Sequence, residues 1–202
     1  MDNPKIVNDK IIFTNKPRLM LASKIILAIT VVVLYVMQAL VFFPMYGRLH
    51  DVNYGNFNFP AIFILLGVSL VMGLSAFIIA IVGAVKNEAP VTIVTVVVKA
   101  VMIPFFGINL YLWIMGISGM LNPFLMLGIP AVGFIGVCLT YVYMLMTSLP
   151  DILYTIIFCI KNRKRPSTFM IVGVILEFFF LGDLIGAILL HKAFKDAIVT
   201  YE

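Results

Sequence analysis

Four ionisable residues stand inside or at the edge of long apolar runs of this chain: Lys99, Asp151, Glu177 and Asp183. Charged groups are costly in a hydrocarbon layer, so they usually face the interior of a helix bundle. There they pair with one another or line a path for ions and polar solutes. Each of the four is therefore a candidate functional residue.

The positions of these residues along their helices predict an ion pair. Lys99 follows Pro90 by nine residues, and Glu177 follows Ser167 by ten. At a helical rise of 1.5 Å per residue, the two lie roughly 14 and 15 Å from the start of their helices, near the middle of a bilayer. On a continuous helix Asp183 would lie about 9 Å beyond Glu177 and about 120° around the axis, so the two carboxylates are not expected to share a face.

Two interpretations of this polar group stay open. In one, a polar cavity or ion path is built from a set of midplane side chains, as in transporters: Lys99, Asn109, Glu177, Asp183 and Gln38. In the other, a static pair of Lys99 and Glu177 fixes the register of the helices, while Asp183 is protonated or faces water. Pro104 and Pro150 are candidate kinks or hinges in the helices concerned.

Motifs for catalysis or metal binding are weak. The tetrapeptide at 116–119, Gly-Ile-Ser-Gly, matches a short motif of intramembrane rhomboid proteases, but neither His50 nor His191 stands in a matching histidine motif. Cys138 and Cys159 lie in apolar runs, without a Cys-x-x-Cys motif or a Cys/His cluster. We expect no enzyme activity, no cofactor and no metal.

The composition indicates a membrane protein. The 202 residues are 63% hydrophobic and 11% charged, against about 45–50% and about 25% in soluble domains. The apolar runs are continuous, which predicts an all-α integral membrane protein. The net charge of +5 comes from Lys and Arg between these runs. It predicts contact with anionic lipid at the cytoplasmic face and no nucleic-acid binding.

Five transmembrane helices are expected. Residues 100–150 carry no charge and are too many for one crossing, so a break is expected near 116–123. The fourth helix would be long and kinked at Pro150. A cytoplasmic tail at 1–23 and a short polar tail at 191–202 would flank the five spans, which are expected at about 24–45, 59–85, 91–117, 124–160 and 168–190.

The basic residues predict the orientation. Lys86 and the N-terminal tail would lie on the cytoplasmic side of a cell membrane, together with a basic cluster: Lys161, Arg163, Lys164 and Arg165. Five crossings then place the C-terminal tail outside, although Lys192 and Lys195 disagree. A hairpin in the last span would bring the tail back, but about 23 residues cannot cross a bilayer twice.

Three segments carry a resemblance to a known family. They are residues 99–106 with Asn109, residues 148–150 and residues 183–190. Together they resemble a family of small bacterial membrane proteins of unknown function. The resemblance implies a location in the bacterial cytoplasmic membrane and no mechanism. It singles out residues that the physical argument also selects: Lys99, Pro104, Asn109, Pro150 and Asp183.

The expected function is therefore broad. Five helices leave little room for the repeated halves of many transporters, which favours a binding, assembly, immunity or accessory membrane subunit. The alternative is a small-molecule or ion transporter with a midplane site at Lys99, Glu177 and Asp183. A homo-oligomer or another membrane protein is the expected partner, because small residues in the second span allow close helix packing.

Overall fold

The computed structural model describes a helical chain with one small strand pair. It describes residues 5–7, 10–12, 17–49, 58–86, 88–119, 129–162, 165–179 and 182–197. The strands β1 (Lys5–Val7) and β2 (Lys10–Ile12) pair antiparallel in the segment expected as a tail. All other elements are helices: α1 Arg18–Leu49, α2 Phe59–Val85, α3 Thr92–Gly119, α4 Ile129–Lys161, α5 Thr168–Leu176 and α6 Asp183–Ala197.

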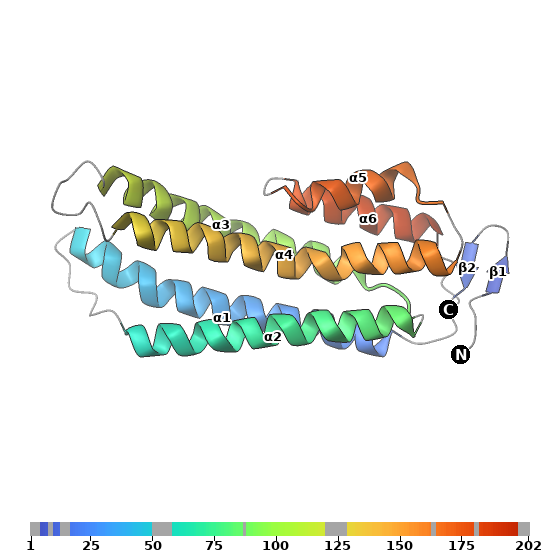
Figure 1. The fold of residues 1–202 in the computed structure, drawn as a ribbon, viewed down its shortest axis with the longest axis horizontal. Coiled ribbons are helices and arrows are strands. Elements are labelled where there is room, and N and C mark those ends of the chain that lie inside the picture. Colours follow the sequence, from blue (N-terminus) through green and yellow to red (C-terminus); the bar gives the residue numbers. More distant parts are fainter. Residues whose placement is uncertain are drawn as a thin grey trace.

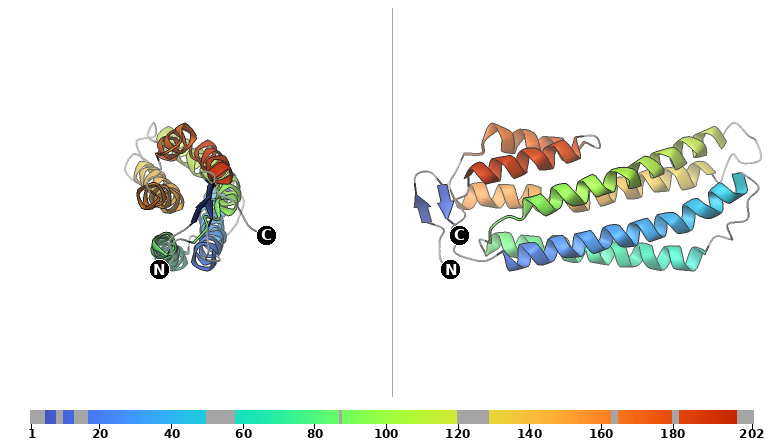
Figure 2. Two further views of the ribbon diagram at one scale, coloured as in Figure 1. Left: turned by 90° about the vertical axis from the view of Figure 1, so that its right-hand side faces the viewer. Right: turned by 180° about the vertical axis from the view of Figure 1, so that it is seen from behind.

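The first four helices form an antiparallel bundle (Figure 1). Each is long and apolar enough to cross a membrane, over Arg18–Pro44, Phe59–Val85, Thr92–Tyr111 and Cys138–Lys161. Contacts run from α1 to α2, α2 to α4, α4 to α3 and α3 back to α1, so the four surround one interior (Figure 2). The all-α membrane class expected from composition is confirmed at this level. We call the end where α1 and α3 begin, and α2 and α4 end, the proximal end.

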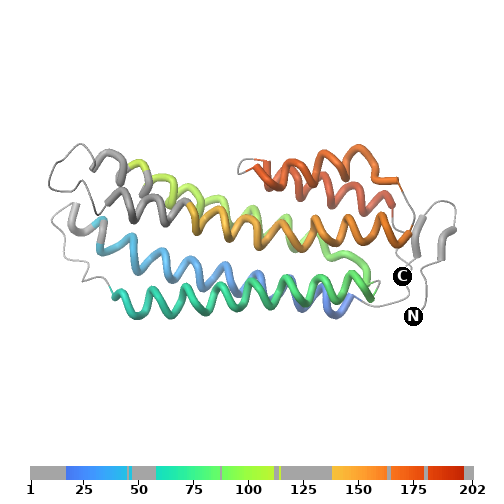
Figure 3. Tube along the Cα trace, viewed as in Figure 1, coloured from blue at the N-terminus to red at the C-terminus, as the bar shows by residue number. Residues whose placement is uncertain are grey.

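The expected fifth helix over 168–190 is wrong, because the chain folds there into a helical hairpin. The nine residues of α5 rise about 13 Å, less than half of a hydrocarbon core. The chain then turns, and α6 runs back beside α5 to the proximal end (Figure 1). The hairpin thus enters the bundle only partway and does not have to cross twice. Figure 3 shows it ending near the middle of the long helices.

Glycines allow the two halves of the hairpin to approach each other closely. Gly182 lies where a Cβ atom would be 2.8 Å from the carbonyl oxygen of Leu176, and Gly186 where it would be 2.6 Å from that of Gly173. Amides on the α6 side close the turn, since Gly182 and Asp183 both donate to the carbonyl of Phe179, each at 2.8 Å. Small residues at these points allow the two halves of the hairpin to pack directly on each other.

The hairpin also changes the expected topology. Because α6 ends at the proximal end, the arrangement with five crossings and an outside C-terminal tail, which depended on a single helix over 168–190, is not seen in the described part of the chain. Lys192 and Lys195 return to the end that holds Lys86 and Lys161. These four lysines can therefore all lie on one side of the membrane, as the distribution of basic residues in membrane proteins predicts.

The break between the third and fourth spans differs in detail from the expectation. The helix α3 continues to Gly119, so residues 116–119 are helical, and α4 is described from Ile129. Residues 120–128, including the expected start of the fourth span at 124, lie outside the described part. Pro150 lies within α4, which continues unbroken to Lys161. A kink at Pro150 stays a prediction.

Aromatic packing fastens the hairpin to the bundle at the proximal end. The ring of Phe194 on α6 lies edge-on to those of Tyr154 and Phe158 on α4, with centroids 5.4 and 5.2 Å apart. All three side chains are buried. This core cluster also includes Met20 of α1 and Ala80 of α2. The helices of the bundle and the hairpin therefore share one core at this end.

We expect positions 86 and 197 to lie on the same side of the membrane. On a background without Cys138 and Cys159, single cysteines at Lys86 and Ala197 should react with an impermeant thiol reagent from one side. A cysteine at Phe59, where α2 begins, should react only from the other side. Reaction of position 197 from the same side as position 59 would contradict the hairpin.

We expect Gly186→Ala to destabilise the hairpin, because its Cβ atom would meet the backbone oxygen of Gly173 at 2.6 Å. Overpacking of this kind lowers the free energy of unfolding by about 1–3 kcal/mol. Unfolding of purified protein in detergent measures the change. Gly107→Ala is the matched control, because no atom lies within 4 Å of its Cβ position. Equal stability of the two variants would argue against the close contact.

Candidate functional site

The ammonium group of Lys99 is the centre of a buried cluster of charged and polar side chains. Its Nζ atom donates to Glu177 Oε1 at 2.9 Å, to Asp183 Oδ1 at 2.6 Å and to Ser148 Oγ at 3.0 Å. Ser148 in turn donates to Asp183 Oδ1 at 2.6 Å. An ammonium group has three donors, so every N–H of Lys99 is used. We call these four residues the Lys99 cluster.

Four helices bring the Lys99 cluster together. Lys99 comes from the proximal half of α3, and Ser148 from α4, two residues before Pro150. Glu177 caps the C-terminal end of α5, and Asp183 lies in the first turn of α6. The two carboxylates thus stand on either side of the turn in the hairpin. The expected contact of Lys99 with Glu177 is present in the structure.

The expected separation of the two carboxylates is wrong. It assumed that one helix continues from Glu177 to Asp183, which would rotate the second carboxylate away. The turn between α5 and α6 instead reverses the chain, so that both carboxylates reach the same Nζ atom. Asp183 does not face water in this structure, because it is buried against Lys99 and Ser148.

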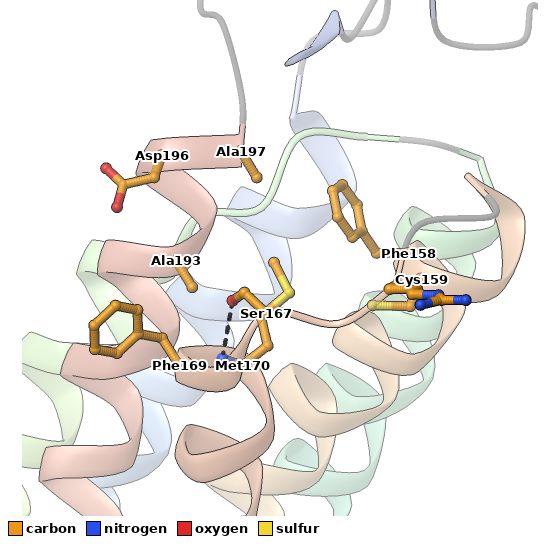
Figure 4. Close-up of a pocket in the computed structure, with 9 residues that line it drawn as sticks. Phe158, Cys159, Ser167, Phe169, Met170, Ala193, Asp196 and Ala197 are labelled. Atoms are coloured by element: carbon orange, nitrogen blue, oxygen red, sulfur yellow. Dashed lines mark hydrogen bonds between the residues drawn. The ribbon is translucent and has the colours of Figure 1, made fainter. Parts of the chain in front are cut away.

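The Lys99 cluster is closed to solvent in this structure. Lys99, Glu177 and Asp183 are 2%, 0% and 3% exposed. A pocket of about 290 Å³ lies elsewhere, at the proximal end between α4, α5 and α6 (Figure 4). Its lining includes Phe158, Met170 and Arg165, and none of the four residues of the Lys99 cluster. The cluster is thus buried, and this pocket does not reach it.

A second buried ion pair lies next to the Lys99 cluster. Lys24 Nζ on α1 donates to Asp151 Oδ1 on α4 at 2.6 Å, and both residues are buried. Asp151 also lies close enough to Lys99 to attract it electrostatically. Because α1 and α4 lie opposite each other around the interior, this pair joins two helices that otherwise make few contacts.

The sequence argument selected Asp151 but missed Lys24 as its partner. Lys24 was placed at the boundary between the tail and the first span, whereas α1 begins six residues earlier at Arg18. Lys24 is the one charged residue between Arg18 and Arg48 of α1, and this was the available signal. Such a group needs a partner of opposite charge at similar depth. Ser148 was also missed, and its hydroxyl gives no signal of this kind.

Glu88 is a further buried carboxylate that the sequence did not single out. Its Oε2 atom accepts from the amides of Leu19 and Met20 at 2.7 and 2.9 Å, at the first turn of α1. A carboxylate at this place satisfies free amides and favours the positive end of the helix dipole. Tyr154 donates to the backbone carbonyl of Glu88 at 2.9 Å. The turn between α2 and α3 is therefore tied to α1 and α4.

Gln38 and Asn109 form a separate polar layer. Gln38 Nε2 donates to Asn109 Oδ1 and to the carbonyl of Phe105, both at 2.9 Å, and Asn109 donates to Thr140 Oγ1 at 2.8 Å. Asn109 lies ten residues after Lys99 in the same helix, a distance of roughly 15 Å. The structure brings these two expected residues together, but not with the Lys99 cluster.

A side chain of α1 contacts the backbone of α3 on either side of Pro104. The Tyr35 hydroxyl donates to the Val101 carbonyl at 2.5 Å and accepts from the Phe105 amide at 3.2 Å. These two backbone groups form one bond in a regular helix. Insertion of a side chain at such a point is a recognised cause of local bending. A kink or hinge at Pro104 stays a prediction, since α3 is helical throughout these residues.

The expected basic cluster is described in part. Lys161 Nζ donates to the carbonyl of Val85 at 2.7 Å, which connects the ends of α4 and α2. Arg165 is exposed and lines the proximal pocket, near Ser167, whose hydroxyl caps α5 (Figure 4). Arg163 and Lys164 lie outside the described residues. Basic groups at this end suit contact with anionic headgroups.

Neither a catalytic group nor a metal site stands out in the described ranges. No three His, Cys, Asp or Glu residues come together there as a set that could hold a metal ion. His191 Nδ1 hydrogen-bonds Thr92 Oγ1 at 2.8 Å, which ties α6 to the start of α3. His50 and the side chain of Ser118 lie outside the described part.

Comparisons with protein families, curated proteins and solved structures find no match for this chain. The resemblance carried by residues 99–109, 148–150 and 183–190 therefore stays an expectation. The fold is a bundle of four helices, each long and apolar enough to cross a membrane, with a shorter helical hairpin beside them, and it suggests a membrane protein.

We expect Asp151→Asn to destabilise the protein strongly, because it leaves the buried ammonium group of Lys24 without a counter-ion. Removing one partner of a buried pair lowers the free energy of unfolding by about 3–5 kcal/mol. Unfolding in detergent measures this loss. Asp196→Asn changes an exposed aspartate of α6 and is the control. If both variants lose the same small amount of unfolding free energy, the assignment of a buried ion pair is wrong.

Proposed function

We propose that the protein is a small membrane transporter for an ion or a polar solute, and that the structure is its closed state. One observation carries the proposal: Lys99 is held inside the bundle by two carboxylates that stand on opposite sides of a helix break. Transporters build their sites in the same way, from interrupted helices whose ends meet near the bilayer midplane.

The energetics support a functional role for the Lys99 cluster. Buried ion pairs are weak sources of stability, because removing charges from water offsets most of their attraction. Apolar side chains would hold the hairpin as well and at lower cost. Non-helical backbone within a membrane is also found where it is buried in protein or lines a cavity. A movable hairpin that uncovers Lys99 accounts for both the buried charges and the non-helical turn between α5 and α6.

A second candidate is a binding or accessory membrane subunit in which the Lys99 cluster is a fixed structural support. Complete burial of its charged members favours this role. In both cases we propose no catalysis, an N-terminus on the cytoplasmic side of a cell membrane and anionic lipid around the basic proximal end. A second copy of the chain or another membrane protein remains the proposed partner of the accessory role.

Access of water to Ser148 separates the two candidates. Ser148→Cys is a small change within the Lys99 cluster, and we place it on a background without Cys138 and Cys159. If the hairpin opens, an impermeant thiol reagent should modify this cysteine slowly in protein embedded in vesicles. A transporter additionally requires that the reaction occurs from each side of the membrane.

Ser69→Cys is the matched control. Ser69 is as buried as Ser148 and hydrogen-bonds another buried hydroxyl, that of Tyr143. It lies on α2, away from the hairpin, and its cysteine should remain protected. Equal protection of both positions from both sides would reject the transporter and leave the fixed support as the better account.

A further inference from the structure

The buried charges of the Lys99 cluster and of the adjacent pair of Lys24 and Asp151 are not balanced as they stand. Glu88 is buried elsewhere, against the first turn of α1. Two cations, Lys24 and Lys99, face three carboxylates, Asp151, Glu177 and Asp183. All five are nearly or completely buried. An uncompensated charge in such a place is strongly unfavourable. A single proton on one carboxylate makes this group of five residues neutral.

The hydrogen bonds show which carboxylates are best placed to stay ionised. Asp183 accepts two bonds of 2.6 Å, from Lys99 and Ser148, and lies in the first turn of α6. The helix dipole there favours negative charge. Asp151 has Lys24 as its own counter-ion at 2.6 Å. Both carboxylates are therefore stabilised as anions.

Glu177 is in the opposite situation. It stands at the C-terminal end of α5, where the helix dipole disfavours negative charge. Only its Oε1 atom is bonded, to Lys99 at the longer distance of 2.9 Å. Its Oε2 atom is buried and has no hydrogen-bond partner among the described residues. A proton on Oε2 replaces an unpaired anionic oxygen by a neutral hydroxyl, which is less costly to bury.

We propose that Glu177 is a proton-binding site and that the bound proton holds the hairpin closed on Lys99. When the hairpin opens to water, the carboxyl group gives its proton to water and leaves a carboxylate and a hydronium ion. Closing requires the reverse transfer. Each cycle of opening and closing then binds and releases one proton at this atom.

The groups that face Glu177 come from each neighbouring element. They are Lys99 on α3, Ser148 and Asp151 on α4, and Asp183 on α6, with Lys24 of α1 behind Asp151. The proton site depends on these groups alone. Only its role as the coupling ion of transport rests on the proposed function.

Infrared spectroscopy of the full chain in lipid nanodiscs tests the proton site. The wild-type protein should show the carbonyl band of a buried protonated carboxyl group in neutral buffer, and Glu177→Gln should remove it. Glu88→Gln is the control and should keep the band, because Glu88 serves the first turn of α1 and not the Lys99 cluster. A wild type without the band, or a band that survives Glu177→Gln, would overturn the assignment.

Accessibility against pH tests the effect on the hairpin. Raising the pH should remove the band and speed the modification of Ser148→Cys. The thiolate is the reacting form of cysteine, so some pH dependence belongs to the thiol itself. Because glutamine cannot ionise, adding Glu177→Gln should leave only that part. The same pH dependence with and without Glu177→Gln, with the band lost as expected, would reject proton control of the hairpin. If raising the pH removes the band but Ser148→Cys stays fully protected, Glu177 is a proton site but the hairpin does not open. That result would also reject the transporter.

Discussion

The arrangement of the chain depends on the need of one buried lysine for counter-ions. Within a membrane, Lys99 cannot be left without them, and the two carboxylates that satisfy it come from opposite sides of the turn between α5 and α6. This requirement couples the position of α3 to the exact fold of the hairpin. A straight helix over the same residues would present only one of the two carboxylates to Lys99.

The other buried polar side chains also fix how the helices are arranged. Lipid offers little hydrophobic reason for one apolar helix to prefer another, so packing and hydrogen bonds set the arrangement. The pair of Lys24 and Asp151 joins α1 to α4, and Gln38 and Asn109 join α1, α3 and α4 at another depth. Glu88 fixes the first turn of α1. Apolar residues place the chain in the membrane, whereas these few contacts determine how its helices are oriented.

The sequence predicted the class of the fold and part of the site. Continuous apolar runs identified the long helices, and counting residues from Pro90 and Ser167 brought Lys99 and Glu177 to the same depth. The hairpin was considered and rejected because 23 residues cannot cross twice, a rule that does not apply to a segment that enters partway. Composition could not reveal that Gly173 and Gly186 let two helices touch. The partner of Asp151 was missed because Lys24 was assigned to the edge of the first span.

The partly inserted hairpin makes the protein wider on one side of the membrane than on the other. At the proximal end, α5 and α6 lie beside the four long helices, whereas at the opposite end the four long helices stand alone (Figures 1 and 2). The molecule therefore displaces more lipid area from one leaflet than from the other. Such a wedge fits best where the bilayer bulges toward the wider side, and movement of the hairpin away from the bundle would alter the lateral pressure that it exerts on that leaflet.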